Sequence, residues 1–385
     1  MRNFRDHLVK KGEIMNVIVK RIVFVIGVLF LTGSALAEPL VGSLQEWNTS
    51  PLRPYDIVAL NGGSIWMNTS EGNAVFTIDP LTGTTTAYTA PFIPARFHTI
   101  ARAPDDTLWI ADGEDRIVHF DPVSGVFTPY PLDAGVFTLP AEPFGVNVAN
   151  DGSVWFTCWI DLCIGQFDPV SGTWQRFAPS PPGVLPDPPD EIAFKADGTV
   201  WFTMRSMSGN PGLGRLNPGT GLFDLWTDPY PGAIDPFGII VLNGQIWFLD
   251  HHANLLVRFN PASSTFTTYS TAPDLTDPHF LVADAYGYIW MSAFVSGTIG
   301  RFDPPTGTFS HVALGDPNSH PMGIALSPTG EIWCAESFTF DQGGVARFQQ
   351  TMDVAVPIFT SWGSFVLILL MGMGGLLPLL RPRAR

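Results

Sequence analysis

The chain has 385 residues, of which 45% are hydrophobic and only 14% are charged; this length suits one large domain or two ordinary ones. Its 38 glycines and 35 prolines favour short strands and turns, and no long stretch has the apolar i, i+3, i+4 spacing of a surface helix. We therefore expect an all-β body with one helix at each end. Residues 38–350 hold 11 of the 20 Lys and Arg and 32 of the 35 Asp and Glu, a net charge near −21, which excludes a nucleic-acid footprint.

The N-terminal segment has the pattern of a secretory signal peptide. Lys20 and Arg21 precede an apolar run over residues 22–31, and residues 35–37 read Ala-Leu-Ala, the small-residue pattern of a cleavage site. The alternative is an uncleaved membrane anchor, but the apolar run is short for a membrane span. We expect residues 1–37 to be removed on export, which would place the body in the periplasm or at the cell surface.

A repeated unit fills the body of the chain. A tryptophan follows a turn and one aliphatic residue seven times, in "NGGSIWM", "PDDTLWI", "NDGSVWF", "ADGTVWF", "LNGQIWF", "AYGYIWM" and "PTGEIWC". Consecutive tryptophans are 43 or 46 residues apart, about the length of one propeller blade. The tryptophans are Trp66, Trp109, Trp155, Trp201, Trp247, Trp290 and Trp333. We expect them to pack between neighbouring blades as core residues.

Each unit contains four predicted strands. An apolar strand precedes the turn, a third strand ends in Asp-Pro or Asn-Pro, as in "HFDPVSG", and a fourth short strand carries an aromatic residue. The seventh unit lacks its fourth strand, and Ser43–Trp47 near the N-terminus matches the missing one. We predict a seven-bladed β-propeller over residues 38–350, with four-stranded antiparallel blades and a ring closed by an N-terminal strand. A six-bladed ring, the alternative, would leave one tryptophan unit unexplained.

The three cysteines offer no zinc site, because no Cys/His spacing matches one. Cys158 and Cys163 flank a four-residue gap, so a disulfide across a hairpin is open to them in an oxidising compartment. Cys334 has no evident partner and follows Trp333, which indicates a small buried residue.

Three columns of the repeat vary while the framework around them recurs. We expect all three to meet at one rim of the central channel, because two lie at the start of the innermost strand and the third near the end of the strand beside it. The histidines and acidic residues that we expect at this rim are His98, Asp112, Asp190, Asp235, Asp250, Asp277, His279, His320 and Glu336. Such groups could bind a divalent cation or exchange protons, and the alternative is a wet polar channel without a ligand. His251 and His252 are interpreted as loop surface.

The C-terminal segment, residues 351–385, has the pattern of a membrane span. Ser364–Leu380 is apolar and Arg381, Arg383 and Arg385 follow it; counted from Ile358, 23 residues would span roughly 34 Å as a helix. Basic residues after the span place the tail in the cytoplasm. The segment resembles bacterial sorting tails that begin with a Pro-Thr-Leu-Ser-Glu-Trp-Gly type motif (IPTL-type), which residues 356–363, "VPIFTSWG", fill loosely.

The repeat "P-x-G-I-x-x-x-x-x-G-x-I-W-x-x-E", with a later "I-G-R-F", resembles the streptogramin (virginiamycin) B lyases. The resemblance implies a seven-bladed propeller that opens a cyclic depsipeptide by magnesium-assisted elimination, with a histidine base on the innermost strand of the last blade. Glu336 and His279 match two of the other site positions. Met322 occupies the base position and cannot take a proton, and His320 replaces the glutamate two residues before it.

These residues lead to one expectation with two rivals. We expect an exported, membrane-tethered propeller, a monomer, that binds a small molecule or peptide, with Mg²⁺ or Ca²⁺ held by His279, His320 and Glu336. The first rival is an active lyase in which His320 is the base and Glu336 assists. The second is a surface protein whose propeller face binds protein or glycan.

Overall fold

The computed structural model describes residues 38–69, 72–180, 183–316, 318–339 and 342–351. These residues form strands and turns and contain no helix, so none of them makes a helix long and apolar enough to cross a membrane. The expected signal peptide and C-terminal span, with the helix expected in each, fall on residues 1–37 and 352–385 and lie outside the described residues.

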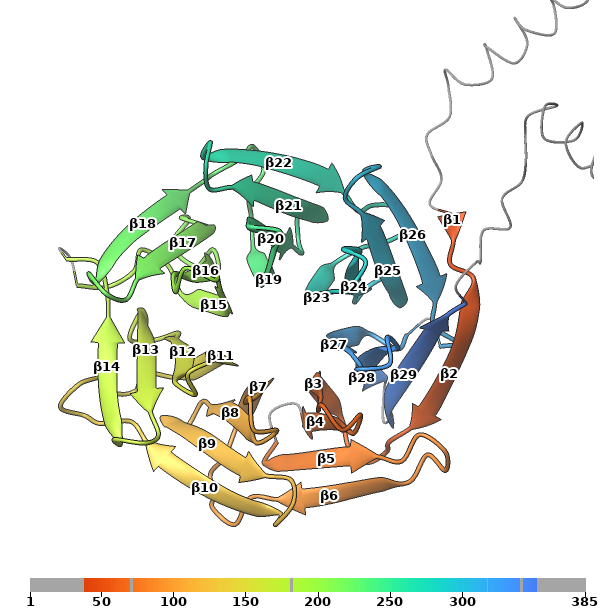
Figure 1. The fold of residues 1–385 in the computed structure, drawn as a ribbon, viewed down its shortest axis with the longest axis horizontal. Helices are drawn as coiled ribbons and strands as arrows, with labels where there is room; N and C mark the ends of the chain where they lie inside the picture. The colour runs from red at the N-terminus through yellow and green to blue at the C-terminus, as the bar shows by residue number, and fades with distance from the viewer. Residues whose placement is uncertain (1–37, 70–71, 181–182, 317, 340–341, 352–385) are drawn as a thin grey trace, which may run out of the picture. The chain divides into compact units, whose positions relative to one another are not determined.

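Seven four-stranded antiparallel sheets stand around a central axis (Figure 1). This confirms the seven-bladed propeller and excludes the six-bladed alternative. In chain order, blade 1 contains β3 (Pro54–Ala59), β4 (Ile65–Thr69), β5 (Ala74–Ile78) and β6 (Thr85–Thr89). Blade 2 contains β7 (Phe97–Arg102), β8 (Leu108–Asp112), β9 (Arg116–Asp121) and β10 (Val126–Pro131). Blade 3 contains β11 (Pro143–Val148), β12 (Val154–Cys158), β13 (Cys163–Asp168) and β14 (Thr173–Phe177).

The remaining blades follow the same order from the axis outward. Blade 4 contains β15 (Pro189–Phe194), β16 (Val200–Met204), β17 (Gly212–Asn217) and β18 (Leu222–Thr227). Blade 5 contains β19 (Pro236–Leu242), β20 (Gln245–Asp250), β21 (Leu255–Asn260) and β22 (Thr265–Ser270). Blade 6 contains β23 (Pro278–Ala283), β24 (Ile289–Ala293), β25 (Thr298–Asp303) and β26 (Thr308–Ala313). Blade 7 contains β27 (Pro321–Leu326), β28 (Ile332–Thr339), β29 (Gln342–Gln350) and, from the N-terminus, β2 (Gly42–Asn48).

The seven repeated tryptophans are core residues, as predicted, and each is at most 5% exposed. Each lies on the second strand of its blade, where it meets the next blade; Trp66, for example, packs against Phe120 of blade 2 with ring centroids 5.4 Å apart. Aromatic rings of this kind bury a large apolar area between neighbouring sheets. The repeated tryptophan therefore joins one blade to the next.

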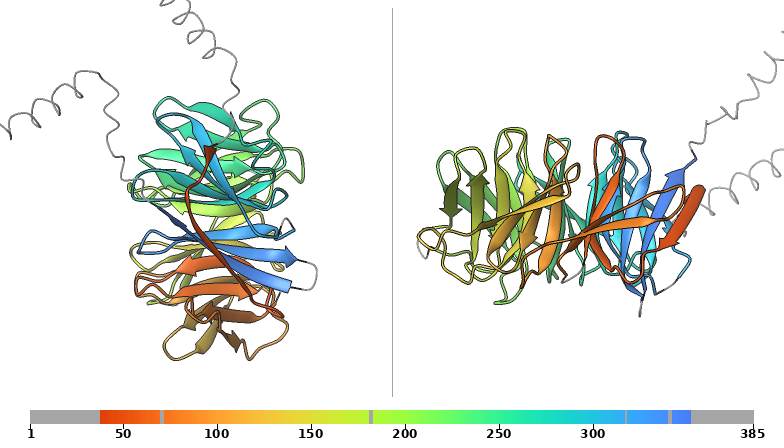
Figure 2. Two further views of the ribbon diagram at one scale, coloured as in Figure 1. Left: turned by 90° about the vertical axis from the view of Figure 1, so that its right-hand side faces the viewer. Right: turned by 90° about the horizontal axis from the view of Figure 1, so that it is seen from below.

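The N-terminal strand closes the ring, as predicted. Strand β2 lies outside β29 in blade 7 (Figures 1 and 2), and its Trp47 stacks on Trp333 with ring centroids 5.4 Å apart and planes 6° apart. A two-residue strand that the sequence did not predict, β1 (Glu38–Pro39), adds a parallel fifth strand to blade 6 by pairing with β26.

All three cysteines are buried and free. Cys158 and Cys163 lie opposite each other in the β12–β13 register, so the hairpin geometry suggested by their spacing is correct, but no disulfide joins them. Cys334 is fully buried, as its position beside Trp333 indicated.

Candidate functional site

A cavity of about 240 Å³ opens at one end of the channel, where the innermost strands begin. Its wall comes from all blades of the ring, mostly from the second residue of each innermost strand. The lining residues are Tyr55, Arg96, Phe97, His98, Glu142, Phe144, Trp159, Arg205, Phe237, His279 and Met322. Six of the seven members of the column at the start of the innermost strand line this space, and Asp190 of blade 4 does not. We call this space the mouth cavity.

Aromatic rings form one wall of the mouth cavity. Phe144 stacks on Trp159 with ring centroids 4.2 Å apart, and Phe237 meets Phe144 edge to face at 6.1 Å. The guanidinium of Arg205 lies 5.3 Å from the ring centre of Trp159 and 5.7 Å from that of Phe237. This wall offers flat apolar surface beside a cation that itself stacks on rings.

A first ionic group lies on blades 2 and 3. Arg96 is paired with Glu142 at 2.8 Å, and His98 Nε2 lies 4.0 Å from the same carboxylate oxygen. Burial, together with the Arg96 charge, lowers the pKa of His98 to about 4. His98 is therefore a neutral imidazole at pH 7, able to accept or donate one hydrogen bond to a ligand.

A second ionic group lies on blades 4 and 5 around Arg205. Its Nε is 3.0 Å from Asp235 and 3.6 Å from Asp190, while Trp159 Nε1 donates a 2.8 Å hydrogen bond to Asp190. Burial raises the pKa of Asp190 to about 7, although Arg205 opposes the shift. The cation and its carboxylates nearly cancel, so the cavity has little net charge to offer an ionic ligand.

His251 extends this group toward blade 6. It is buried, so the interpretation of His251 as loop surface was wrong. It is only 2% exposed, and its two ring nitrogens lie 2.9 Å from Asp235 and 2.9 Å from Asp277. Burial opposes protonation, but the hydrogen bonds to these two carboxylates raise the pKa of His251 to about 9. The adjacent His279, with ring centroids 4.5 Å apart, has its pKa lowered to about 4 by burial and by the His251 charge. His252 does lie at the surface, with its side chain 57% exposed.

The column three residues after each tryptophan does not line the mouth cavity, which corrects the expectation that all three columns meet there. Asp112 instead accepts the backbone N–H groups of Arg96 and Glu114 and pairs with Arg116. Asp250 likewise accepts the Tyr230 hydroxyl and neighbouring backbone N–H groups. These carboxylates hold the loops at the channel rim, so their hydrogen-bonding capacity is already used.

The three blade 7 residues that the sequence predicted at one site, His320, Met322 and Glu336, do not all line the mouth cavity. Met322 lines the mouth cavity. His320 lies outside its lining, with Nδ1 3.1 Å from the Phe294 carbonyl oxygen. Glu336 is 6% exposed, and burial, with Glu46 and Asp316 nearby, raises its pKa to about 8. Its Oε1 is without a hydrogen-bond partner among the described residues.

Sequence reasoning missed a fourth column, the residue four positions after each tryptophan. Within the described residues it contains Gly113, Trp159, Arg205, His251, Phe294 and Ser337. Trp159 and Arg205 line the mouth cavity, and the Phe294 ring packs at a tilt against His279 and His320, with ring centroids 5.2 and 4.5 Å away. Most of these residues lie one position after the end of the second strand, so testing the neighbour of the column three residues after each tryptophan would have found them.

Comparison with known proteins places this ring in a family. The model of the virginiamycin B lyase family matches residues 44–347, most of the chain. The chain belongs to the virginiamycin B lyase family. No curated protein matches it.

Solved structures of lyases share the fold. A streptogramin B lyase structure is similar with 24% identity and a TM-score of 0.69, covering 80% of this chain and 98% of its own. The Staphylococcus aureus virginiamycin B lyase follows at 23% identity and a TM-score of 0.67, covering 79% and 98%. A catalytically inactive variant of that lyase with quinupristin gives the same values. At these identities the similarity shows the fold.

The magnesium ion that membership of the lyase family implies does not fit the residues matched to it here. Among the described residues, two groups of three His, Cys, Asp or Glu side chains bring ligand atoms within 4.8 Å of one another, and neither contains His320 or Glu336. The Phe294 ring packs against both His279 and His320. Mg²⁺ also prefers oxygen ligands in near-ideal octahedral geometry, which two separated imidazoles and one buried carboxyl do not supply.

Proposed function

We propose that this lyase-family propeller is a ligand-binding protein whose mouth cavity takes an aromatic or apolar group, and that it does not catalyse the family's elimination. One observation carries the proposal. Met322 lines the cavity at the position where the resemblance implies the base, and a thioether cannot remove a proton from carbon. The neighbouring histidine, His320, is bonded to the Phe294 carbonyl oxygen instead.

The size and lining of the cavity support this ligand class. A volume of about 240 Å³ is below the roughly 300–1,000 Å³ of sites that enclose a drug-sized molecule. It suits one ring or side chain of a larger molecule, such as a peptide. The stacked rings of Phe144 and Trp159 favour a flat group. Arg96 and Arg205, each paired with a carboxylate of the protein, also line the cavity and offer N–H donors to the ligand.

We also propose that the propeller works outside the cytoplasm, tethered to the membrane or processed from it. The support is in the sequence: a basic and apolar segment ending in Ala-Leu-Ala, and an apolar C-terminal segment followed by arginines. Pulse labelling of the expressed chain, with fractionation, tests this through the mass and location of the mature protein.

The decisive experiment offers the full chain a streptogramin B depsipeptide, quinupristin, with and without Mg²⁺. We expect no ring-opened product by mass spectrometry. Binding is measured in parallel by calorimetry for quinupristin and for short peptides with an aromatic residue. Trp159→Ala is expected to weaken binding about two- to tenfold, since an aromatic pair is worth roughly 0.5–1.5 kcal/mol.

Two matched variants locate the binding surface. Arg96 lines the mouth cavity, whereas Arg102, on the same blade, lines a separate cavity of about 250 Å³ farther along the channel. Arg96→Gln should weaken binding and Arg102→Gln should not. A linear product that depends on Mg²⁺ and disappears in His320→Ala would establish the lyase instead. Binding that neither Trp159→Ala nor Arg96→Gln alters would assign recognition to another face of the propeller.

A further inference from the structure

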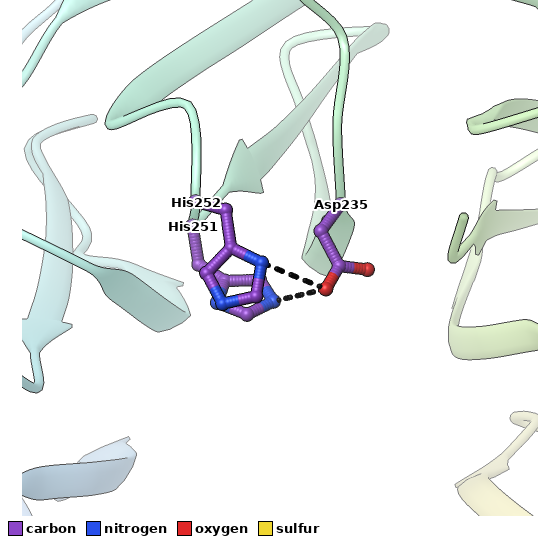
Figure 3. A group of neighbouring side chains, drawn as sticks. All are labelled: Asp235, His251 and His252. Carbon is purple, nitrogen blue, oxygen red and sulfur yellow. Dashed lines mark hydrogen bonds and ion pairs between the residues drawn. The ribbon is translucent and has the colours of Figure 1, made fainter. Parts of the chain in front are cut away.

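Two adjacent imidazoles after β20 point at one carboxylate oxygen (Figure 3). His251 Nε2 lies 2.9 Å and His252 Nδ1 lies 3.2 Å from Asp235 Oδ2. All three ligand atoms lie within 4.8 Å of one another. Ligands bound to one ion at about 2 Å are themselves roughly 3 Å apart, so these atoms already have nearly the spacing of a coordination sphere.

Second-sphere contacts fix the orientation of two of the three groups. His251 Nδ1 lies 2.9 Å from Asp277, which leaves Nε2 as the nitrogen directed at Asp235. Arg205 Nε donates a 3.0 Å hydrogen bond to Asp235 Oδ1 and a longer one of 3.3 Å to Oδ2, so Oδ1 is the better satisfied oxygen and Oδ2 also faces the imidazoles. A ligating histidine almost always donates its other N–H to a carboxylate or carbonyl, and a ligating carboxylate is itself hydrogen-bonded.

We propose that Asp235, His251 and His252 form a binding site for a transition-metal ion, of which Zn²⁺ fits best. Two imidazoles and one carboxylate are ligands that zinc and its first-row neighbours accept, whereas Mg²⁺ and Ca²⁺ select oxygen. This set shares no residue with the position matched to the family's magnesium, and it stands independently of the ligand proposed for the mouth cavity.

The three proposed ligands differ in burial: Asp235 and His251 are buried, and His252 is exposed. Asp235 is 6% and His251 2% exposed, so packing holds them in place before an ion arrives. The His252 side chain is 57% exposed, which leaves the remaining coordination positions open to water or to a small ligand. Three protein ligands with an open position are the arrangement of catalytic rather than structural zinc sites.

A second group of three, His251, Asp277 and His279, also brings ligand atoms together. It is the weaker candidate, because an ion there would have to displace the Asp277 contact to His251 Nδ1 and the 2.9 Å contact of His279 Nδ1 to the Asp277 carbonyl oxygen. An ion in the Asp235 group keeps the Asp277 contact. It displaces the proton shared by His251 Nε2 and Asp235 and two longer Arg205 contacts, 3.3 Å to Asp235 Oδ2 and 3.4 Å to His251 Nε2.

The test uses the full chain purified without a histidine tag and stripped with a chelator. Zn²⁺ is titrated by calorimetry and Co²⁺ by visible absorption, with Mg²⁺ as comparison. We expect one saturable site for Zn²⁺ and Co²⁺ and none for Mg²⁺. His252→Ala, an exposed position that should not affect folding, is expected to abolish this site, and Asp277→Asn to weaken it about 10–100-fold.

Controls make the outcome decisive. His119→Ala removes an imidazole from β9, away from the site, and should leave affinity unchanged. Stoichiometric binding that survives in His252→Ala, or the absence of saturable Zn²⁺ and Co²⁺ binding in the wild-type chain, would overturn the proposal. Binding lost in His279→Ala but kept in His252→Ala would assign the ion to the other group and overturn it equally.

Discussion

Blades 5 and 7 place a buried carboxyl group at the same position of the repeat and satisfy it to different degrees. In the register of the first two strands, Asp250 lies opposite Pro236 in blade 5 and Glu336 lies opposite Pro321 in blade 7. Asp250 accepts the Tyr230 hydroxyl and three backbone N–H groups, whereas Glu336 Oε1 has no partner among the described residues. The repeat thus determines where the carboxyl group lies, and the neighbouring loop determines whether the buried group stabilises or destabilises the folded protein.

The largest effect should come from removing the satisfied carboxylate. Asp250→Ala leaves a buried hydroxyl and three backbone N–H groups without their acceptor, so we expect a loss of about 3–5 kcal/mol in the free energy of unfolding. Urea unfolding measures it. Asp224→Ala, which removes an exposed ion pair on β18, is the control and should barely move the midpoint. Equal midpoints for the two variants would show that Asp250 is not structural.

Replacing Glu336, whose Oε1 has no hydrogen-bond partner among the described residues, should raise the free energy of unfolding, by an amount that depends on pH. The native pKa of Glu336 is about 8, above its ordinary value of 4.5, so the native state holds a proton that the unfolded state releases. Wild-type stability is therefore lost as pH rises from 4.5 to 8. Glu336→Gln removes this cost, and we expect a gain of about 2–4 kcal/mol at pH 8 and almost none at pH 4.5.

Urea unfolding of wild type and Glu336→Gln at both pH values tests the sign. If the variant is less stable than wild type at pH 8, an ionised Glu336 makes contacts that burial alone does not suggest. Glu331→Gln, on a half-buried residue of the same blade paired with Arg347, controls for loss of a charge.

The outer strands of the two blades give a third, smaller comparison. Trp47 on β2 stacks on Trp333, as Tyr269 on β22 stacks on Trp247. We expect Trp47→Ala and Tyr269→Ala each to cost about 2 kcal/mol. Only Trp47→Ala should lower hydrogen-exchange protection across its whole strand, because no short turn joins β2 to β29. Equal protection losses in β2 and β22 would contradict this.

The smallest effect should be at His320. Its φ of +46° is a region that glycine adopts without strain, so His320→Gly relieves strain while losing one hydrogen bond to Phe294. We expect a net change below about 1 kcal/mol in thermal unfolding. Asp277→Gly, also at positive φ, should cost more because it breaks the contact with His251.

The fold could be predicted from the sequence because the same strand and turn pattern recurs in every blade. A tryptophan every 43–46 residues sets the blade count, and the match of Ser43–Trp47 to the missing outer strand gives ring closure. Strand β1 was missed because two residues carry no periodicity. The disulfide was left open because spacing alone does not decide whether two opposed thiols are oxidised.

The site was predicted only in part, for a reason of strand geometry. The second residue of the innermost strand lines the mouth cavity in every blade except blade 4, so one column could be assigned. The second strand of blade 5 ends at Asp250, and His251 lies in the turn that follows it, so the alternation that orients strand residues does not extend to His251. A dipeptide such as His251-His252 reads as polar loop until the partners of the first histidine, Asp235 and Asp277, are brought to it from two other loops.

Closure of the ring by β2 has a consequence for how the protein is made. The two strands that complete blade 7, residues 42–48 and 342–350, are about 300 residues apart in sequence, so their contact forms at a high loop-closure cost. During synthesis, β2 emerges early and must wait for β29 before it can pair. Until then β2 is a strand without a partner, whose free N–H and C=O groups invite pairing with another chain. The seam that makes the ring complete is therefore also where a partly made copy is most exposed to misassembly.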